Sequence, residues 1–153
     1  MRILVLYDSK TGNTDKMASA IAEGIRETGS EVDVKKIGQS FTPGIVSSYG
    51  GVVFGSPAIY ADATRELKDF LLILKEFIGT RKPTGAKAGI FGSYGYDGAW
   101  SLENKLRGYA LGLGYDVFPE ACLKVDYEIR THAEETIADC KAWGKRFAGF
   151  LAD

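Results

Sequence analysis

The polar stretch Tyr7–Thr14, YDSKTGNT, is where the residue types of this sequence first suggest chemistry. It offers hydroxyl groups, an amide and one glycine soon after the apolar run Ile3–Leu6. Hydroxyl and amide groups can surround a phosphate, and Gly12 lets the backbone approach it closely. Because a helix is expected to follow, unpaired backbone amides and the positive end of the helix dipole also favour an anion here. We therefore predict a phosphate-binding loop.

An ordinary polar turn that caps the helix is the alternative interpretation of this loop. A cap needs one polar residue, whereas the loop has five, namely Ser9, Lys10, Thr11, Asn13 and Thr14. The sequence contains no GxxxxGKS/T motif, and the Gly-Leu-Gly at 112–114 lacks the third glycine of GxGxxG. Binding through hydroxyls and amides suits a phosphomonoester that is held and not transferred.

A second loop, GSPAIYAD at Gly55–Asp62, follows the apolar run Val52–Phe54. The Ser-Pro at 56–57 breaks the strand, so Ile59 and Tyr60 are expected at the rim of the sheet. Packing of these two side chains in the core is the alternative. The segment 57–61 has no glycine and Ile59 is β-branched, so a positive φ would be costly there.

The third loop, FGSYGYDGAW at Phe91–Trp100, interleaves three glycines with two tyrosines and a tryptophan. Glycines allow close approach of the backbone and aromatic side chains stack, so such a loop can hold a flat ring. A loose surface loop is the alternative. Trp100 is expected just inside the next helix, as a packing residue. Together the three loops predict a site with a phosphate at one end and a planar aromatic group at the other.

The elements that position these loops alternate between strand and helix along the chain. Apolar runs predict strands at 3–6, 32–37, 52–54, 87–91 and 115–125, the last interrupted at Pro119. Helical spacing predicts helices at 15–28, at 67–79, at 102–113 and from about 133 onward, one or two helical turns from Thr42-Pro43, and a turn at 81–85.

Five strands alternating with helices indicate an α/β fold with a parallel sheet that is covered on both faces. Ligands of such folds bind beyond the carboxyl ends of the strands, where the strand order reverses. Because all three loops follow strands, we expect them to meet at that edge. The length of 153 residues suits one domain, residues 1–153.

Composition argues against several other classes of function. The net charge is −1 and the basic residues are scattered, so neither nucleic acid nor an anionic membrane is an expected partner. Cys122 and Cys140 have no zinc-site spacing, so no metal is expected, and they suit reduced, buried cysteines of a cytoplasmic protein. Asp8 ends the first apolar run too early for a signal peptide, and no apolar run is long enough to span a membrane.

Through these motifs the whole chain resembles the flavodoxin family. The run S-K-T-G-N-T matches its phosphate signature, and G-S-P followed by a rim aromatic matches its second flavin loop. The third loop, G-S-Y-G-Y-D-G, more closely resembles the flavodoxin-like domain of A-type flavodiiron proteins. The resemblance implies a short-chain, flavodoxin-like, doubly wound five-stranded parallel sheet in the order 2-1-3-4-5, three layers in all, and FMN as cofactor.

Carried over residue by residue, the resemblance assigns cofactor-binding positions in all three loops. The phosphate would be held by Ser9, Lys10, Thr11, Gly12, Asn13 and Thr14. The isoalloxazine would be flanked by Pro57, Ala58, Ile59, Tyr60, Ser93, Tyr94, Gly95, Tyr96, Asp97, Gly98 and Ala99. Tyr96 is the expected main stacking ring, with Tyr60 or Ile59 against the other face. The chain has a single histidine, His132, and no H-x-E-x-D cluster, so reduction of oxygen or nitric oxide is not implied.

Three functions follow from these observations. The favoured one is an FMN electron carrier between redox partner proteins, because no general acid, activated nucleophile or separate substrate pocket is evident. The alternative is a small FMN-dependent NAD(P)H/quinone reductase or the flavin subunit of a larger oxidoreductase. A flavin-free binding module on the same fold is the third. A phosphoacceptor receiver is disfavoured because Ser56, not an aspartate, follows the third strand.

Overall fold

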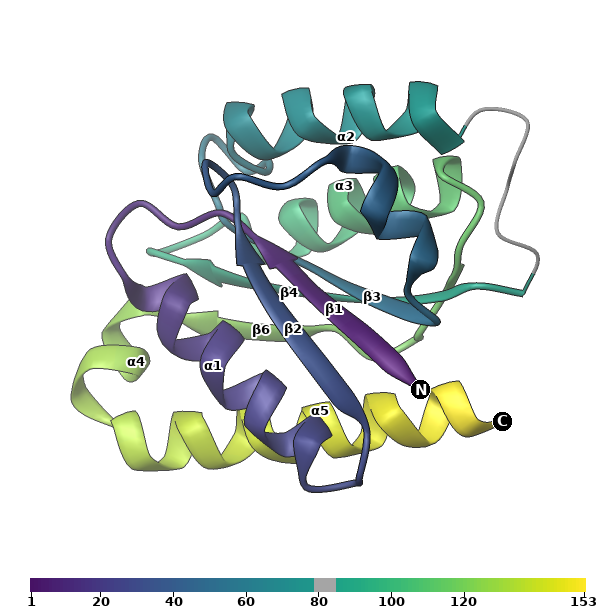
Figure 1. Cartoon of the computed structure of the whole chain (residues 1–153). Coiled ribbons are helices and arrows are strands. Elements are labelled where there is room, and N and C mark those ends of the chain that lie inside the picture. The colour runs from purple at the N-terminus through teal and green to yellow at the C-terminus, as the bar shows by residue number, and fades with distance from the viewer. Residues whose placement is uncertain (79–84) are drawn as a thin grey trace.

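A parallel sheet with helices on both faces is the frame of the molecule (Figure 1). The structure is a computed structural model that describes residues 1–78 and 85–153. The strands are β1 (Arg2–Tyr7), β2 (Glu31–Lys36), β3 (Gly51–Pro57), β4 (Lys87–Tyr94), β5 (Asp116–Val117) and β6 (Cys122–Val125). Their order is β2-β1-β3-β4-β5, which confirms the predicted doubly wound fold.

The edge of the sheet beyond β4 is built from two short strands. β5 pairs with Lys87 and Ala88 at the start of β4, and β6 pairs with 91–94 at its end. Pro119 lies between β5 and β6, where the missing amide hydrogen of proline cannot support a continuous ladder. The predicted interruption of the fifth strand is therefore confirmed.

Two helical layers cover the sheet (Figure 1). α1 (Asn13–Arg26) and α5 (Ala133–Ala152) pack on one face, and η1 (Pro43–Ser48), α2 (Arg65–Ile78) and α3 (Ala99–Gly112) pack on the other. The short α4 (Asp126–Thr131), which follows β6, was not predicted from the sequence. The expected helix end at position 79 and most of the expected turn at 81–85 lie outside the described residues.

The central strands are buried on both faces, which explains their unbroken apolar runs. In β1, Ile3 and Val5 belong to the core beneath α1 and α5, whereas Leu4 and Leu6 belong to the core beneath α2 and α3. This alternation gives one strand two buried faces, so each helical layer is anchored by its own half of the strand's side chains.

Two glycines allow α1 and α5 to cross at very short distance. A Cβ atom on Gly24 would collide with the backbone carbonyl of Lys141, and one on Gly144 would collide with the backbone carbonyl of Ile21. Both obstacles are backbone atoms of the opposite helix, which cannot turn away as a side chain can. The crossing therefore fixes α1, and with it the loop that precedes α1, against the last helix.

None of the helices within residues 1–78 and 85–153 is both long and apolar enough to cross a bilayer.

Candidate functional site

The carboxyl ends of β1, β3 and β4 bring the three loops into direct contact. The amide of Asp8 donates to the carbonyl of Gly55 at 3.1 Å, which joins the first loop to β3. The amide of Ala58 donates to the carbonyl of Ser93 at 2.7 Å, which joins the second loop to the third. The hydroxyls of Thr14 and Ser93 are hydrogen-bonded at 2.8 Å. The structure thus joins residues that are up to 79 positions apart in the chain.

The first loop leads into α1 without a side-chain cap. Gly12 occupies the N-cap position with φ of 92°, a left-handed conformation that favours glycine, and has no capping side chain. Ser9 turns its hydroxyl inward to accept a hydrogen bond from the Gly12 amide at 3.2 Å. No side chain therefore caps the first-turn amides of α1 at this position. Together with the helix dipole, they suit the phosphate of a nucleotide.

The side chains of Asn13 and Thr14 hold the first loop to its surroundings. Both residues are buried. The Asn13 side-chain amide nitrogen donates to a carboxylate oxygen of Asp126 at 3.1 Å, and the Thr14 hydroxyl is hydrogen-bonded to the Ser93 hydroxyl. The neighbouring Thr11 is exposed, and its side chain makes no hydrogen bond to any residue that the structure describes. Among the threonines of the loop, Thr11 is therefore the better position for probing anion binding separately from folding.

Lys10 has its charge partly neutralised by two carboxylates. Its ammonium lies 2.9 Å from Glu66 and 3.5 Å from Asp8. Asp8 is buried and also accepts hydrogen bonds from the Thr64 hydroxyl at 2.6 Å and the Ser9 amide at 2.8 Å. An anion at this loop would accordingly depend more on amides and hydroxyls than on the lysine charge.

The second loop contains a tight turn from Ile59 to Asp62. The amide of Ile59 donates to the carbonyl of Asp62 at 2.8 Å, and the amide of Asp62 donates back at 3.1 Å. The two central residues, Tyr60 and Ala61, have φ of 50° and 60°, as in a type I′ turn. The expected backbone strain thus falls on Tyr60 and Ala61, one and two positions after Ile59.

Asp62 anchors this turn through three hydrogen bonds. It accepts from the Tyr109 hydroxyl at 2.8 Å, the Ala63 amide at 2.7 Å and the Lys68 ammonium at 3.3 Å. Burial acts to raise the pKa of Asp62, but these donors outweigh burial and the pKa is lowered. Burial, followed by the hydrogen bond to Asp62, raises the pKa of Tyr109 to about 12. The turn is therefore held by a charged carboxylate across the neutral range.

The third loop touches the second at a glycine. Gly98 has φ of 88° and caps α3, and a Cβ atom on it would come within 3.3 Å of the Ala61 Cα. Ser93 is buried at the end of β4, whereas Tyr96 is 95% exposed. Tyr60 in the second loop is 99% exposed, so the alternative that it packs in the core is wrong. Two loops in contact thus each present a free aromatic ring.

The expectation that Trp100 packs in the core is also wrong. Trp100 does lie in the first turn of α3, but it is 78% exposed. The buried side of this helix is formed by Leu102, Leu106 and Ala110, and Trp100 is on the solvent side. His132 is exposed and lies directly before the last helix.

Sequence reasoning missed Asp62, Thr64, Tyr109 and Asp126 as supports of the site. Asp62 ends the motif of the second loop, and its position there was the only available signal. Asp126 lies 113 positions from its partner Asn13, and no spacing rule connects them. Such a contact follows from the tertiary fold alone.

We expect Ala61→Gly to raise the free energy of unfolding by roughly 0.5 kcal/mol. Relief of the left-handed backbone contributes about 1 kcal/mol, and the more flexible unfolded chain offsets part of it. Ala58→Gly in the same loop is the control. Because Ala58 has no positive φ, this substitution should lower the free energy of unfolding by roughly 1 kcal/mol. Urea unfolding of both variants measures the difference. Equal losses in the two variants would contradict the left-handed turn.

Comparison with known proteins agrees with this geometry. The sequence profile of the Flavodoxin family matches residues 5–143. Flavodoxin of Clostridium beijerinckii is 30% identical over 149 residues, which cover 94% of this chain and 97% of that protein. Coenzyme F420H(2) oxidase of Methanothermobacter marburgensis is 31% identical over 150 residues, and the chain spans only 35% of its length. The solved structure of a flavodoxin from the domain Archaea has the same fold, with a TM-score of 0.85 over 100% of both chains at 22% identity.

Proposed function

The chain belongs to the flavodoxin family, and on that basis we propose that it binds FMN and carries electrons between redox partner proteins. The observation that carries the proposal is the meeting of the uncapped α1 N-terminus with two loops that each expose a tyrosine. One end of this edge offers donors to a phosphate and the other offers flat apolar surfaces. That combination matches a phosphorylated flavin better than it matches a nucleotide substrate for transfer.

The phosphate would be held by the backbone amides at the start of α1, helped by the Thr11 hydroxyl. Gly12 supports this role because its left-handed backbone has no side chain in the way. Asn13 and Thr14 would act by fixing the loop, through Asp126 and Ser93 respectively.

The flat ring would lie between the second and third loops, flanked by Tyr60 and Tyr96. When bound, FMN supplies the one-electron and two-electron chemistry that the side chains of this chain do not provide. The protein's part is to hold the ring, to shield its faces and to leave an edge open to a partner. The high exposure of both tyrosines favours exchange with a docked protein at this rim.

An absorbance spectrum followed by a relay assay tests this function. The purified protein should show flavin bands, and mass spectrometry of the released cofactor should give the mass of FMN. In the presence of NADPH, a flavodoxin reductase and cytochrome c, reduction of cytochrome c should rise in proportion to added protein. NADPH alone should leave the flavin bands unchanged. A colourless protein that takes up no FMN would rule out the proposal.

A second candidate is a flavin subunit of a larger oxidoreductase. Its support is the oxidase relative, of which the chain spans 35%. Rapid oxidation of NADPH by the purified protein with a quinone would favour a reductase, and activity only with a co-purifying enzyme subunit would favour the subunit. Either result would replace the carrier function without changing the FMN assignment.

We expect Tyr96→Ala to weaken FMN binding by about 0.5–1.5 kcal/mol beyond the loss of contact area, because a stacked aromatic pair is removed. It should also increase the fluorescence of bound flavin, which a stacked tyrosine quenches. Phe77→Ala is the matched control. Phe77 is an aromatic residue that is 60% exposed, and it lies near the carboxyl end of α2, whereas the second loop precedes the amino end of this helix. Unchanged affinity and fluorescence in Tyr96→Ala would assign the stacking role to Tyr60 or Tyr94.

A further inference from the structure

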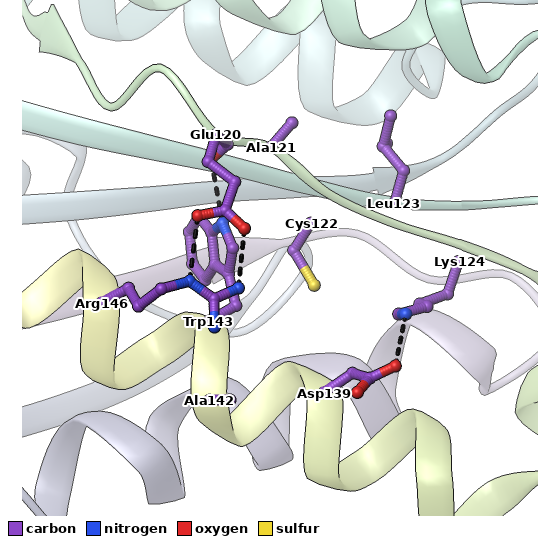
Figure 2. A pocket seen from close by; sticks show the side chains of 9 residues that line it. All are labelled: Glu120, Ala121, Cys122, Leu123, Lys124, Asp139, Ala142, Trp143 and Arg146. Atoms are coloured by element: carbon purple, nitrogen blue, oxygen red, sulfur yellow. Dashed lines mark hydrogen bonds and ion pairs between the residues drawn. The ribbon is translucent and has the colours of Figure 1, made fainter.

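The edge strand β6 is joined to α5 by a row of polar contacts, shown in Figure 2. Glu120 forms a bidentate ion pair with Arg146 at 2.7 and 2.9 Å, and the Glu120 carbonyl accepts from the Trp143 indole at 2.9 Å. Lys124 pairs with Asp139 at 2.8 Å. We call this row the strand–helix seam. It comprises residues 120–124, which are the start of β6 and the two residues before it, and residues 139–146 of α5. It borders a hollow of about 170 Å³.

A pair of cysteines lies in the middle of the strand–helix seam. Cys122 is between the two ion-paired strand positions, and its sulfur is directed toward α5 (Figure 2). The Cys122 sulfur lies 3.7 Å from the sulfur of Cys140 on α5, and both cysteines are free thiols. Cys122 lines the hollow, whereas Cys140 has no exposed surface. Cys122 is itself only 4% exposed, so a reagent has to be small enough to enter the hollow to reach it, and Cys140 lies directly behind it.

We propose that Cys122 and Cys140 are a redox-active thiol pair that a peroxide converts reversibly into a disulfide between β6 and α5. The two sulfurs need to approach by less than 2 Å to reach bonding distance, a shift that side-chain rotation and a small strand movement can supply. β6 pairs with β4 alone among the strands that the structure describes, so its outer side is free to move.

The reaction proceeds in two balanced steps. The Cys122 sulfur attacks one oxygen of hydrogen peroxide and the O–O bond breaks, which leaves a sulfenic acid on Cys122 and one water that carries the thiol proton. The Cys140 sulfur then attacks the Cys122 sulfur, the S–O bond breaks, and a second water leaves with the Cys140 proton. Two electrons pass from the thiols to the peroxide. A dithiol reductant reverses the oxidation by exchange.

The electrostatics of the seam support Cys140 as the resolving nucleophile. The hydrogen bond from the Cys122 thiol lowers the pKa of Cys140, and the nearby Lys124 ammonium acts in the same direction. The hydrogen bond to Cys140 and burial raise the pKa of Cys122, so Cys122 attacks through the small thiolate fraction that a proton shift along this hydrogen bond supplies. The thiolate is the reactive form in both attacks.

Peptide mapping after peroxide treatment tests the thiol pair. The chain has two cysteines, so the number of free thiols in the denatured protein should fall from two to zero after treatment of the purified, folded protein. Mass spectrometry without reductant should find the peptides of Cys122 and Cys140 joined within one chain, and dithiothreitol should restore both thiols. Retention of two thiols, or a sulfinic acid on Cys122 with no disulfide, would overturn the proposal.

Two further measurements test the role of Cys140 and whether the disulfide forms in the native fold. Cys140→Ser should stop the reaction at an over-oxidised Cys122 under the same treatment, because no resolving thiol remains. The rate of disulfide formation in the parent should not change with urea below the unfolding transition. A rate that climbs with urea would mean that the disulfide forms only in opened chains, and would overturn a native site.

Discussion

FMN should bind the cofactor-free protein at least about a hundredfold more tightly than riboflavin, which corresponds to roughly 2.7 kcal/mol. The two ligands share the same ring and differ in the phosphate. Only the phosphate can accept from the amides at the start of α1 and benefit from the helix dipole. A charge-assisted hydrogen bond is worth about 1.5–3 kcal/mol, so one or two of them account for the expected preference. Fluorescence titration with both ligands measures it.

Replacement of Thr11 tests how much one hydroxyl contributes to binding of the phosphate. Thr11→Val should weaken FMN binding by roughly 1–3 kcal/mol and leave riboflavin binding unchanged. Because Thr11 is exposed, urea unfolding without flavin should match the parent. Thr28→Val, two residues beyond the carboxyl end of α1, is the control and should bind both ligands normally. Equal affinity of the parent for FMN and riboflavin would refute the phosphate assignment.

Gly144→Ala should lower the free energy of unfolding by roughly 1–2 kcal/mol. The added methyl group must displace the backbone carbonyl of Ile21, and overpacking of this kind typically costs about 1–3 kcal/mol. The gain in helix propensity, about 1 kcal/mol, offsets only part of this cost when the obstacle is rigid. Urea unfolding of the cofactor-free protein is the measurement.

Gly149→Ala in the same helix is the matched control for this substitution. A Cβ atom on Gly149 meets nothing within 4 Å, so helix propensity acts alone and stability should rise by up to about 1 kcal/mol. Opposite signs for the two substitutions are the expected result. If Gly144→Ala also stabilises the protein, α1 and α5 do not cross as closely as the structure shows.

The parallel sheet and the edge that carries the loops could be predicted because they depend on local patterns, whereas the strand order was implied by the resemblance to flavodoxins. Unbroken apolar runs such as Val52–Phe54 indicate strands buried on both faces, and Pro119 marks the break in the last strand. The helix α4 could not be predicted, since a segment of six residues carries too little periodicity to identify. The crossing at Gly24 and Gly144 could not be predicted either, because each glycine is isolated in a helical pattern.

The loops of the candidate site were predictable as segments, but the directions of their side chains were not. The exposure of Trp100 depends on how α3 is rotated against the sheet, which the loop motif does not encode. The left-handed Tyr60 and Ala61 depend on the hydrogen bonds between Ile59 and Asp62. Thr14 and Ser93 look like two separate phosphate or flavin ligands in the sequence, whereas the fold pairs their hydroxyls. Long-range pairing decides what each polar side chain is free to bind.

The close crossing of α1 and α5 has a consequence for the order of events during synthesis. On the ribosome, α1 emerges early and α5 emerges after every strand of the sheet. Until then the α1 surface around Gly24 has no partner, and its apolar side chains remain open to solvent or to a chaperone. The loop that starts α1 consequently gains its final support only when the last helix docks. A nascent chain halted before residue 133 would hold the three loops and the contacts of Asn13 with Asp126 and of Thr14 with Ser93, but α1 would lack its packing against α5.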